Sequence, residues 1–539
     1  MLVTGNYLDV QIGFQAFSEK PPLFMWVQAL SMRVFGVGEF AARFPNAIVG
    51  ILTLVGIYLL GERLVDRRFG LWWALAFAGS LLPNLYFHSG IIDPLFNLLI
   101  FAGIVSLFAF ERSRQTGSSP RRLLSASYSG REWVLLLVAG ISIGLAILTK
   151  GPVGLLLPGL TWMAFWVVKR KRAARLPLSR FELPIIPMVI WVAVAGIVAA
   201  PWYVAVAKHG AGANSSNFVW GFVARQIELV RTGVAGHTGP WYFHFVVLGL
   251  GCFPASVFAV SALRRRTGSS PDVRDLRLWM ILMLIVVVVI FSLVQTKIVH
   301  YSSLAYFPIT FLAALAITDA ERNATLWPRY LGFAAVGIGL IWAAVFFAVP
   351  VLGLMIAHNQ LDLSRFASDQ LARATVAVPV GWSPLDLVPG TAYLVAILSA
   401  LVVLLRKRDA KLFAWILFGA TAIVVPLALA RIAPKVERYT QSTPIAFYQS
   451  LRGCDCYIAP LGFKSYAHLF YARIPPEHSA RAAGVAPERY EGWLLSGPID
   501  RPVYFVSKLG KADRWRDQPG LKVIGAQDGF VFFRRDPPI

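Results

Sequence analysis

Long apolar segments separated by short charged loops dominate the pattern of the chain. A run of about 20 apolar residues is the length of helix that crosses a bilayer core of roughly 30 Å. Lipid cannot satisfy free backbone polar groups, so such runs are expected to be helical. The pattern predicts twelve transmembrane helices, at 43–61, 69–88, 90–110, 133–149, 152–168, 184–206, 241–263, 276–294, 301–319, 329–357, 388–405 and 411–429.

The stretch 21–37, PPLFMWVQALSMRVFGV, differs from these spans. It opens with two prolines and contains Arg33. Counting it as a full span would also put the first basic loop on the wrong side of the membrane relative to its neighbours. We therefore predict a helix that lies at the membrane interface.

The sequence after residue 430 loses the long apolar runs. Residues 456–461 and 502–506 are typical of strands, and 465–473 of a helix. In 522–535 two strand-like runs flank Asp528-Gly529, a dipeptide favoured in hairpin turns. We predict a polytopic α-helical membrane domain over 1–430 and a small extracytoplasmic α/β domain over 431–539.

The composition agrees with a membrane protein. Hydrophobic residues make up 57% of the chain and charged residues 15%, whereas soluble domains average about 45–50% and about 25%. The chain has 51 Lys+Arg against 28 Asp+Glu, a formal net charge of +23. This basic excess lies in short loops, so it indicates the lipid bilayer and not nucleic acid as the partner.

The basic loops also predict the orientation. Clusters lie at 63–68, 112–131, 169–175, 264–266 and 406–411, in loops on alternate sides of the spans. Positively charged loops stay on the cytoplasmic side. Residues 1–42 and 431–539 are therefore expected on the opposite face.

Several charged residues interrupt apolar sequence near the outside ends of the spans. They are Asp93, Lys150 and Lys297 with His300, and Glu19-Lys20 lies in an outside segment. A charge at the middle of a span costs about 2.5–3.5 kcal/mol. Each residue alone is explained equally well by snorkelling or by satisfying a helix end. Because they gather on one face, together they predict a single polar cavity at the outside surface of the membrane that the helices span.

The residue types of this set suggest a chemistry. Lysines at headgroup depth suit the phosphate of a lipid, and carboxylates suit a divalent metal ion or proton abstraction. Both together predict a reaction on a phosphate-linked lipid. Cys454-Asp455-Cys456, which holds two of the three cysteines, leaves a metal site, a disulfide and a plain structural role open.

Five segments carry a family resemblance: SEKPPLF (18–24), FAARFPNAIVG (40–50), LTKGPVGLLLPGL (148–160), GHTGPWYF (236–243) and TKIVHYSSLAYFP (296–308). In this order they resemble the polyprenyl-phosphate-sugar-dependent membrane glycosyltransferases, which include bacterial relatives of protein O-mannosyltransferases and the lipid A aminoarabinose transferase. The resemblance implies a fold of the GT-C type in the bacterial inner membrane, with the active site on the periplasmic face.

The resemblance also assigns roles to residues. It implies catalytic roles for Lys20 and Asp93, a divalent metal site at Glu19, and substrate contacts from Lys150, Arg231, His237, Lys297, His300 and Tyr301. Gln226 and Glu228 in RQIELVR match the family only loosely. The family's first helix and its acidic pair, whose aspartate is the expected base, are expected before Met1.

The implied reaction moves a sugar with inversion from a polyprenyl-phosphate donor to a hydroxyl of a glycolipid or protein acceptor. Fixed cations stabilise the leaving phosphate more in the transition state than in the ground state. No nucleotide cofactor is expected, because the chain has no Gly-rich nucleotide motif. Two alternatives stay open: a transporter or flippase for a lipid-linked sugar, and a noncatalytic relative that lacks its base.

Overall fold

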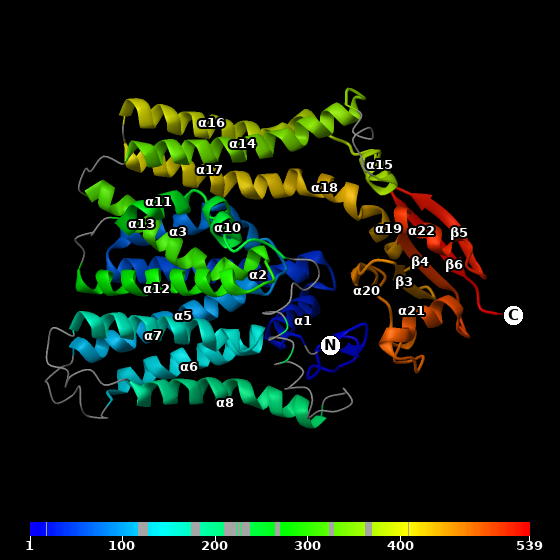
Figure 1. Ribbon diagram of the computed structural model, residues 1–539, viewed down its shortest axis with the longest axis horizontal. Coiled ribbons are helices and arrows are strands. Elements are labelled where there is room, and N and C mark those ends of the chain that lie inside the picture. The colour runs from blue at the N-terminus through cyan, green and yellow to red at the C-terminus, as the bar shows by residue number, and fades with distance from the viewer. Residues whose placement is uncertain are drawn as a thin grey trace.

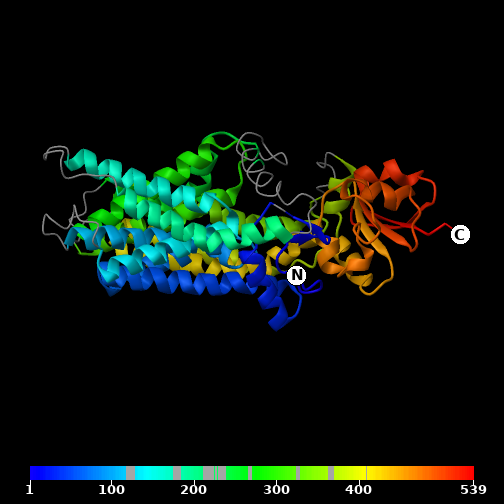
Figure 2. The same cartoon turned by 90° about the horizontal axis from the view of Figure 1, so that it is seen from below.

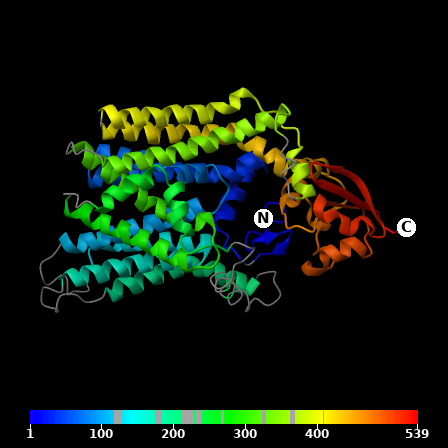
Figure 3. The same ribbon diagram turned by 45° about the horizontal axis from the view of Figure 1, so that its top comes forward.

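A computed structural model describes the chain except for residues 18, 117–127, 174–183, 210–223, 225–227, 229–237, 265–269, 323–327, 362–368, 408 and 539. The molecule is elongated, with a bundle of long helices at one end and an α/β domain at the other (Figures 1 and 2). The N-terminal segment lies between these two parts (Figure 3).

The helices of the bundle occupy the apolar segments of the sequence. They are α2 (Glu39–Leu64), α3 (Arg67–Ala78), α4 (Leu81–Phe87), α5 (Asp93–Thr116), α6 (Gly130–Lys150), α7 (Val153–Ala173), α8 (Ile185–His209), α10 (Phe243–Gly251), α11 (Ala255–Arg264), α12 (Pro271–Leu293), η3 (Val299–Ala305), α13 (Tyr306–Arg322), α14 (Arg329–Ala357), α16 (Val388–Val402), η6 (Val403–Lys407) and α17 (Ala410–Arg431).

The predicted fold class is confirmed, whereas the number of spans is not. Among the described residues, nine helices are long and apolar enough to cross a membrane, and ten if the bent pair α10–α11 is one span. Segment 69–88 is helical but breaks between α3 and α4 at Gly79-Ser80. Segment 152–168 is helical as α7, but α7 ends in a basic run and is not among those ten.

Short elements lie at the end of the bundle that is nearer the C-terminal domain (Figure 1). A two-residue hairpin, β1 (Gln11–Ile12) and β2 (Gln15–Ala16), precedes α1 (Leu23–Phe35). With 13 residues, α1 is about 20 Å long, too short to span the bilayer, as the sequence predicted. The short helices α15 (Gln370–Val376) and η5 (Pro384–Leu387) lie between α14 and α16 in the chain.

The C-terminal part is built on a four-stranded sheet in the order β3-β4-β6-β5. Strand β3 runs parallel to β4, and the other neighbours are antiparallel. The predicted strands and the hairpin turn at Asp528-Gly529 are confirmed, and both turn residues have a positive φ. The elements are α18 (Ala433–Thr440), α19 (Ser442–Ser450), β3 (Tyr457–Leu461), α20 (Ala467–Tyr471), η7 (Pro476–His478), α21 (Pro487–Ser496), β4 (Val503–Lys508), α22 (Leu509–Arg516), β5 (Leu521–Gln527) and β6 (Phe530–Arg535).

The bundle and the sheet have separate cores. A large cluster of buried side chains joins the membrane helices, with Phe101 stacked on Phe307 at 4.0 Å between ring centroids. Two smaller clusters lie on the two faces of the sheet. The boundary at residue 430 stays a prediction, because α18 follows α17 almost without interruption.

Candidate functional site

A cavity of about 580 Å³ opens at the end of the bundle where α5 begins and α6 ends. Its polar end is formed by side chains from four places in the chain: Lys20 before α1, the start of α5, the end of α6 and η3. Its apolar walls come mainly from α7, α8 and α12. The polar lining residues are Lys20, Asp93, Asn97, Lys150 and Tyr301.

An ion pair lies at the polar end of this cavity. Lys150 Nζ lies 2.5 Å from Asp93 Oδ1, and both side chains are largely buried. Asp93 is the first residue of α5, where the helix dipole favours a negative charge. The Lys150 ammonium also lies 5.2 Å from the Tyr301 ring centroid and 5.5 Å from that of Phe96. A desolvated cation between two rings gains about 2 kcal/mol from such contacts.

The turn η3 brings further polar residues toward this pair. His300 Nε2 lies 3.9 Å from Asp93 Oδ2, which is close enough for an electrostatic contact but too long for a hydrogen bond. Two buried hydrogen bonds hold the turn in place. Asn97 Nδ2 donates to Ser303 Oγ at 2.8 Å, and His244 Nδ1 lies 3.1 Å from Ser302 Oγ.

Asn97, Phe96 and His244 were missed by sequence reasoning. Asn97 lies four residues after Asp93 on the same face of α5, one helical turn further along. A polar residue repeated at this spacing in an apolar helix was the available signal. No sequence pattern marks Phe96 or His244, because their neighbours are supplied by other helices.

The apolar walls reach deep into the bundle. The lining residues of α7 run from Val153 to Met163, about 15 Å along a helix axis. Leu156 and Met163 on this wall are 47% and 48% exposed, so the wall is open along its length. Trp191 of α8 and Phe291 of α12 close the opposite side. The cavity therefore joins a charged end to a long apolar groove.

Lys297 is not among the residues that line this cavity, and its predicted substrate contact stays a prediction. It is buried, and its Nζ donates to the carbonyl oxygens of Phe291, Ser292 and Val294 at 3.1, 2.7 and 2.6 Å. An ammonium has three donors, so all of them are used on the C-terminal end of α12. Burial lowers the pKa of this ammonium from its ordinary value.

The remaining predicted site residues divide into two groups. Arg231 and His237, with Gln226, lie outside the described residues. Glu19 is described and half-buried, but it is not among the cavity-lining residues. Within the described ranges, no three His, Cys, Asp or Glu side chains come together as metal ligands. The divalent metal site predicted at Glu19 stays a prediction, and we derive no step through a metal ion.

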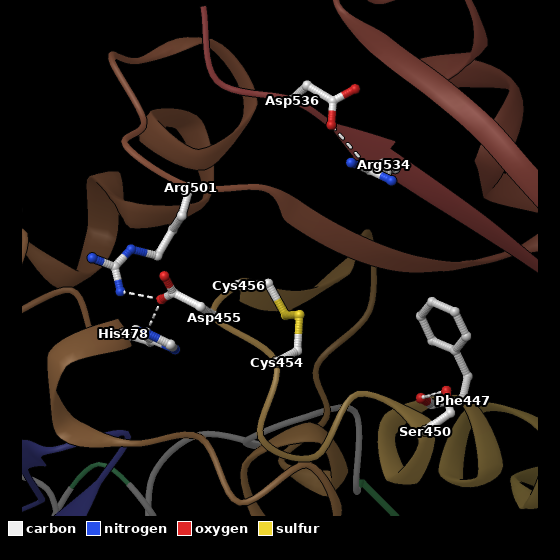
Figure 4. The surroundings of a disulfide bond; sticks show 9 residues. All are labelled: Phe447, Ser450, Cys454, Asp455, Cys456, His478, Arg501, Arg534 and Asp536. Carbon is white, nitrogen blue, oxygen red and sulfur yellow. Dashed lines mark hydrogen bonds and ion pairs between the residues drawn. A yellow bond between two sulfur atoms is a disulfide. The ribbon is translucent and has the colours of Figure 1, made fainter.

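The two cysteines of the C-terminal part form a disulfide with each other (Figure 4). Between them, Asp455 accepts from His478 Nε2 at 2.9 Å and from Arg501 Nη1 at 2.6 Å. Tyr457 donates to the neighbouring Asp500 at 2.8 Å. Of the alternatives left open by the sequence, the structure has the disulfide, and this polar cluster ties the loop to its own domain.

The fold and the cavity together define a multi-span membrane enzyme of the GT-C type, and comparison with known proteins agrees. Residues 19–203 match the family described as dolichyl-phosphate-mannose-protein mannosyltransferase. The undecaprenyl phosphate-alpha-4-amino-4-deoxy-L-arabinose arabinosyl transferase of Pseudomonas paraeruginosa is 29% identical over 538 residues, covering 96% of this chain and 88% of that protein. The enzyme of the same name from Pseudomonas aeruginosa strain UCBPP-PA14 is 28% identical with the same coverage.

Solved structures give the same fold. The crystal structure of ArnT from Cupriavidus metallidurans bound to undecaprenyl phosphate superposes with a TM-score of 0.69 at 18% identity, over 99% of this chain and 91% of that one. Its apo form gives 0.66 at 16% identity, with the same coverage. The chain is therefore similar to the polyprenyl-phosphate-sugar-dependent membrane glycosyltransferases in sequence over 96% of its length and in fold.

Proposed function

We propose that this glycosyltransferase takes its sugar from a polyprenyl-phosphate donor that occupies the cavity, with the phosphate at Lys20 and Lys150 and the polyprenyl chain along α7. The observation that carries the proposal is the shape of the cavity, which places two lysines at the end of an apolar groove. A lipid phosphate needs both a cationic end and an apolar wall. The half-exposed wall residues of α7 suit entry from the bilayer.

The named relatives support this donor class. The related arabinosyl transferases carry undecaprenyl phosphate in their names, and the Cupriavidus metallidurans structure holds undecaprenyl phosphate. The relatives' sugar, 4-amino-4-deoxy-L-arabinose, is the first donor sugar to test. For the acceptor we propose a hydroxyl of a glycolipid such as lipid A, with a protein hydroxyl as the alternative.

The proposed chemistry follows from the charges at the polar end. When the glycosidic bond to phosphate breaks, negative charge grows on the phosphate oxygen that leaves. Lys20 and Lys150 are in place before the reaction, so they stabilise that charge without reorganisation. Asp93 holds the Lys150 ammonium at the site through the 2.5 Å contact. The acceptor hydroxyl oxygen attacks the anomeric carbon from the opposite face as the bond to phosphate breaks, its proton passes to a general base, and the configuration inverts.

We further propose that the cavity and the C-terminal domain face the periplasm of a bacterial inner membrane. The basic ends of α2 and α7, which include Arg63 and Lys169, lie at the end of the bundle opposite the C-terminal domain (Figure 1). Such clusters stay in the cytoplasm. Cysteine labelling tests this: Arg514→Cys, exposed on α22, should react in intact spheroplasts, and Arg63→Cys only after the membrane is opened. The reverse pattern contradicts the orientation.

The donor role is tested by release of polyprenyl phosphate from a labelled donor in reconstituted membranes. Lys20→Ala should lower turnover roughly 100- to 1,000-fold, because one preorganised donor at developing charge is lost. Turnover close to that of the unchanged protein would remove Lys20 from the site. If unchanged protein moves the intact donor across vesicles without releasing phosphate, the flippase alternative replaces the transferase.

A further inference from the structure

The C-terminal domain contacts the chain on both sides of Lys20, at the N-terminal hairpin and at the start of α2. Tyr471, the last residue of α20, donates through its hydroxyl to Glu39 Oε1 at 2.6 Å. Arg473 Nη2 donates to the backbone oxygen of Val37 at 2.9 Å. Leu469 of the same helix lies beside Gly13 of the N-terminal hairpin, where an added Cβ would come within 3.8 Å of it. Figure 1 shows α20 next to the N-terminal segment.

Val37 and Glu39 belong to the elbow that joins α1 to α2. Gly36 at this elbow has φ 80°, a conformation that favours glycine, and α2 begins only at Glu39. Within the elbow, Ser31 Oγ donates to the carbonyl oxygen of Ala41 at 2.7 Å, and the Phe35 ring contacts the rings of Phe40 and Phe44. Tyr471 and Arg473 add contacts from the C-terminal domain on the outer side of the turn.

The opposite side of the N-terminal segment is held by the bundle. Trp26 of α1 donates through its indole nitrogen to the oxygen of Tyr7 at 2.7 Å, and Trp202 of α8 donates to that of Leu8 at 2.9 Å. Apart from the short hairpin, the chain before α1 has no regular structure of its own. This segment contacts the bundle on one side and α20 on the other.

Lys20 lies at the centre of this arrangement. It is followed by Pro21 and Pro22, whose fixed φ angles couple it stiffly to the start of α1. A rotation of α1 about the elbow would therefore move Lys20 relative to Lys150. Tyr471 keeps its proton at neutral pH, since burial and then Glu39 raise its pKa to about 12, so its hydroxyl remains a donor.

We propose that the C-terminal domain is a positioning element of the donor site: α20 holds the α1–α2 elbow and the hairpin so that Lys20 stays at the polar end of the cavity. This inference rests on the proposed donor role of Lys20. Tyr471 and Arg473 are positioning residues, because they act through Lys20 and do not line the cavity.

A double-mutant cycle tests this role. Tyr471→Phe with Arg473→Gln should lower kcat/KM for the labelled donor about tenfold, the size expected when bonds to a charged or backbone acceptor are lost. In a Lys20→Ala background the same two changes should have less than about twofold effect, because residues that act through one another are not additive. Tyr457→Phe, which removes a tyrosine–aspartate bond inside the same domain, is the matched control and should leave kcat/KM unchanged.

The outcomes separate this inference from the proposed function. A defect of Lys20→Ala together with normal Tyr471→Phe/Arg473→Gln protein overturns the positioning role alone. An equal loss with and without Lys20 also overturns it, because the domain then acts by another route. A silent Lys20→Ala overturns the donor role itself. If the double variant is poorly folded, the single variants Tyr471→Phe and Arg473→Gln decide: each should lower kcat/KM severalfold, and normal kcat/KM in both overturns the positioning role.

Discussion

Two aspartate–lysine pairs lie at helix ends in this molecule, and their surroundings differ. Asp93 and Lys150 join α5 to α6 at the cavity. Asp386 of η5 pairs with Lys435 of α18 at the passage to the C-terminal domain. Asp386 is fully buried and also accepts from the Ser383 backbone nitrogen at 2.8 Å, while Arg431 Nε lies 3.6 Å away. Lys435 further donates to the oxygen of Gly381 at 2.7 Å.

The two lysines differ in how many of their three N–H donors remain for a ligand. Lys435 is committed to a carboxylate and a backbone oxygen, with the Trp382 ring centroid 5.4 Å away. Among the described residues, Lys150 has one hydrogen-bond acceptor, Asp93, and otherwise faces two rings and the cavity. Aromatic rings do not use up N–H donors. A buried ion pair can thus be structural or keep donors for a ligand, according to its other neighbours.

The largest effect is expected from Lys150→Met. This change removes a cation aimed at the developing phosphate charge, so turnover should fall roughly 100- to 1,000-fold. Lys435→Met at the other pair should leave turnover per folded molecule within about twofold. Phosphate release in the same membranes measures both. Equal losses would show that the two pairs do the same work.

The sequence predicted the cavity because charged residues are costly within apolar, membrane-spanning segments and therefore indicate a function. Lys20 and Lys150 interrupt apolar sequence on the face opposite the basic loops, and that asymmetry was sufficient to bring them together. The same logic predicts a substrate contact for Lys297, which is not among the residues that line the cavity. A lone charge can serve a ligand or a helix end, and only the structure places three carbonyl oxygens around this ammonium.

The helical spans followed from hydropathy, but their breaks did not. Apolar sequence continues through Gly79-Ser80, so no change of pattern announces that α3 and α4 are separate. The contact between α20 and the start of α2 could not be predicted either, because Tyr471 and Glu39 lie far apart in sequence. Contacts between segments far apart in the chain depend on how the helices pack. A single sequence does not reveal that packing.

Asp386→Asn should change stability rather than activity. It leaves Lys435 and Arg431 beside a neutral amide. Breaking a buried pair costs about 3–5 kcal/mol, and the cost here should be nearer 2 kcal/mol, because these two side chains remain 23% and 40% exposed. A lower thermal midpoint with normal turnover at low temperature is expected. An unchanged midpoint would mean that Asp386 is as dispensable as a surface carboxylate.

Lys297→Met extends the comparison to a third buried lysine. The carbonyl oxygens at the end of α12 lose their donor, which should destabilise the protein by about 1–2 kcal/mol. Turnover measured well below the melting transition should stay within about threefold, since a capping group does not contact the donor phosphate. A loss as large as that of Lys150→Met, at an unchanged melting temperature, would restore Lys297 to the donor site.

The smallest effect is expected from Arg33→Ala, which tests whether position or charge alone matters. Arg33 is exposed in the last turn of α1, the helix that follows Lys20. Its charge interacts favourably with the end of the helix, a contribution of about 0.3–1 kcal/mol that salt screens. Because it does not line the cavity, donor kcat/KM should be unchanged at moderate ionic strength. If Arg33→Ala instead weakened donor use as Lys20→Ala does, the general positive potential of the N-terminal segment would attract the phosphate. The number of N–H donors that Lys150 and Lys435 have left would then not explain which lysine binds the phosphate.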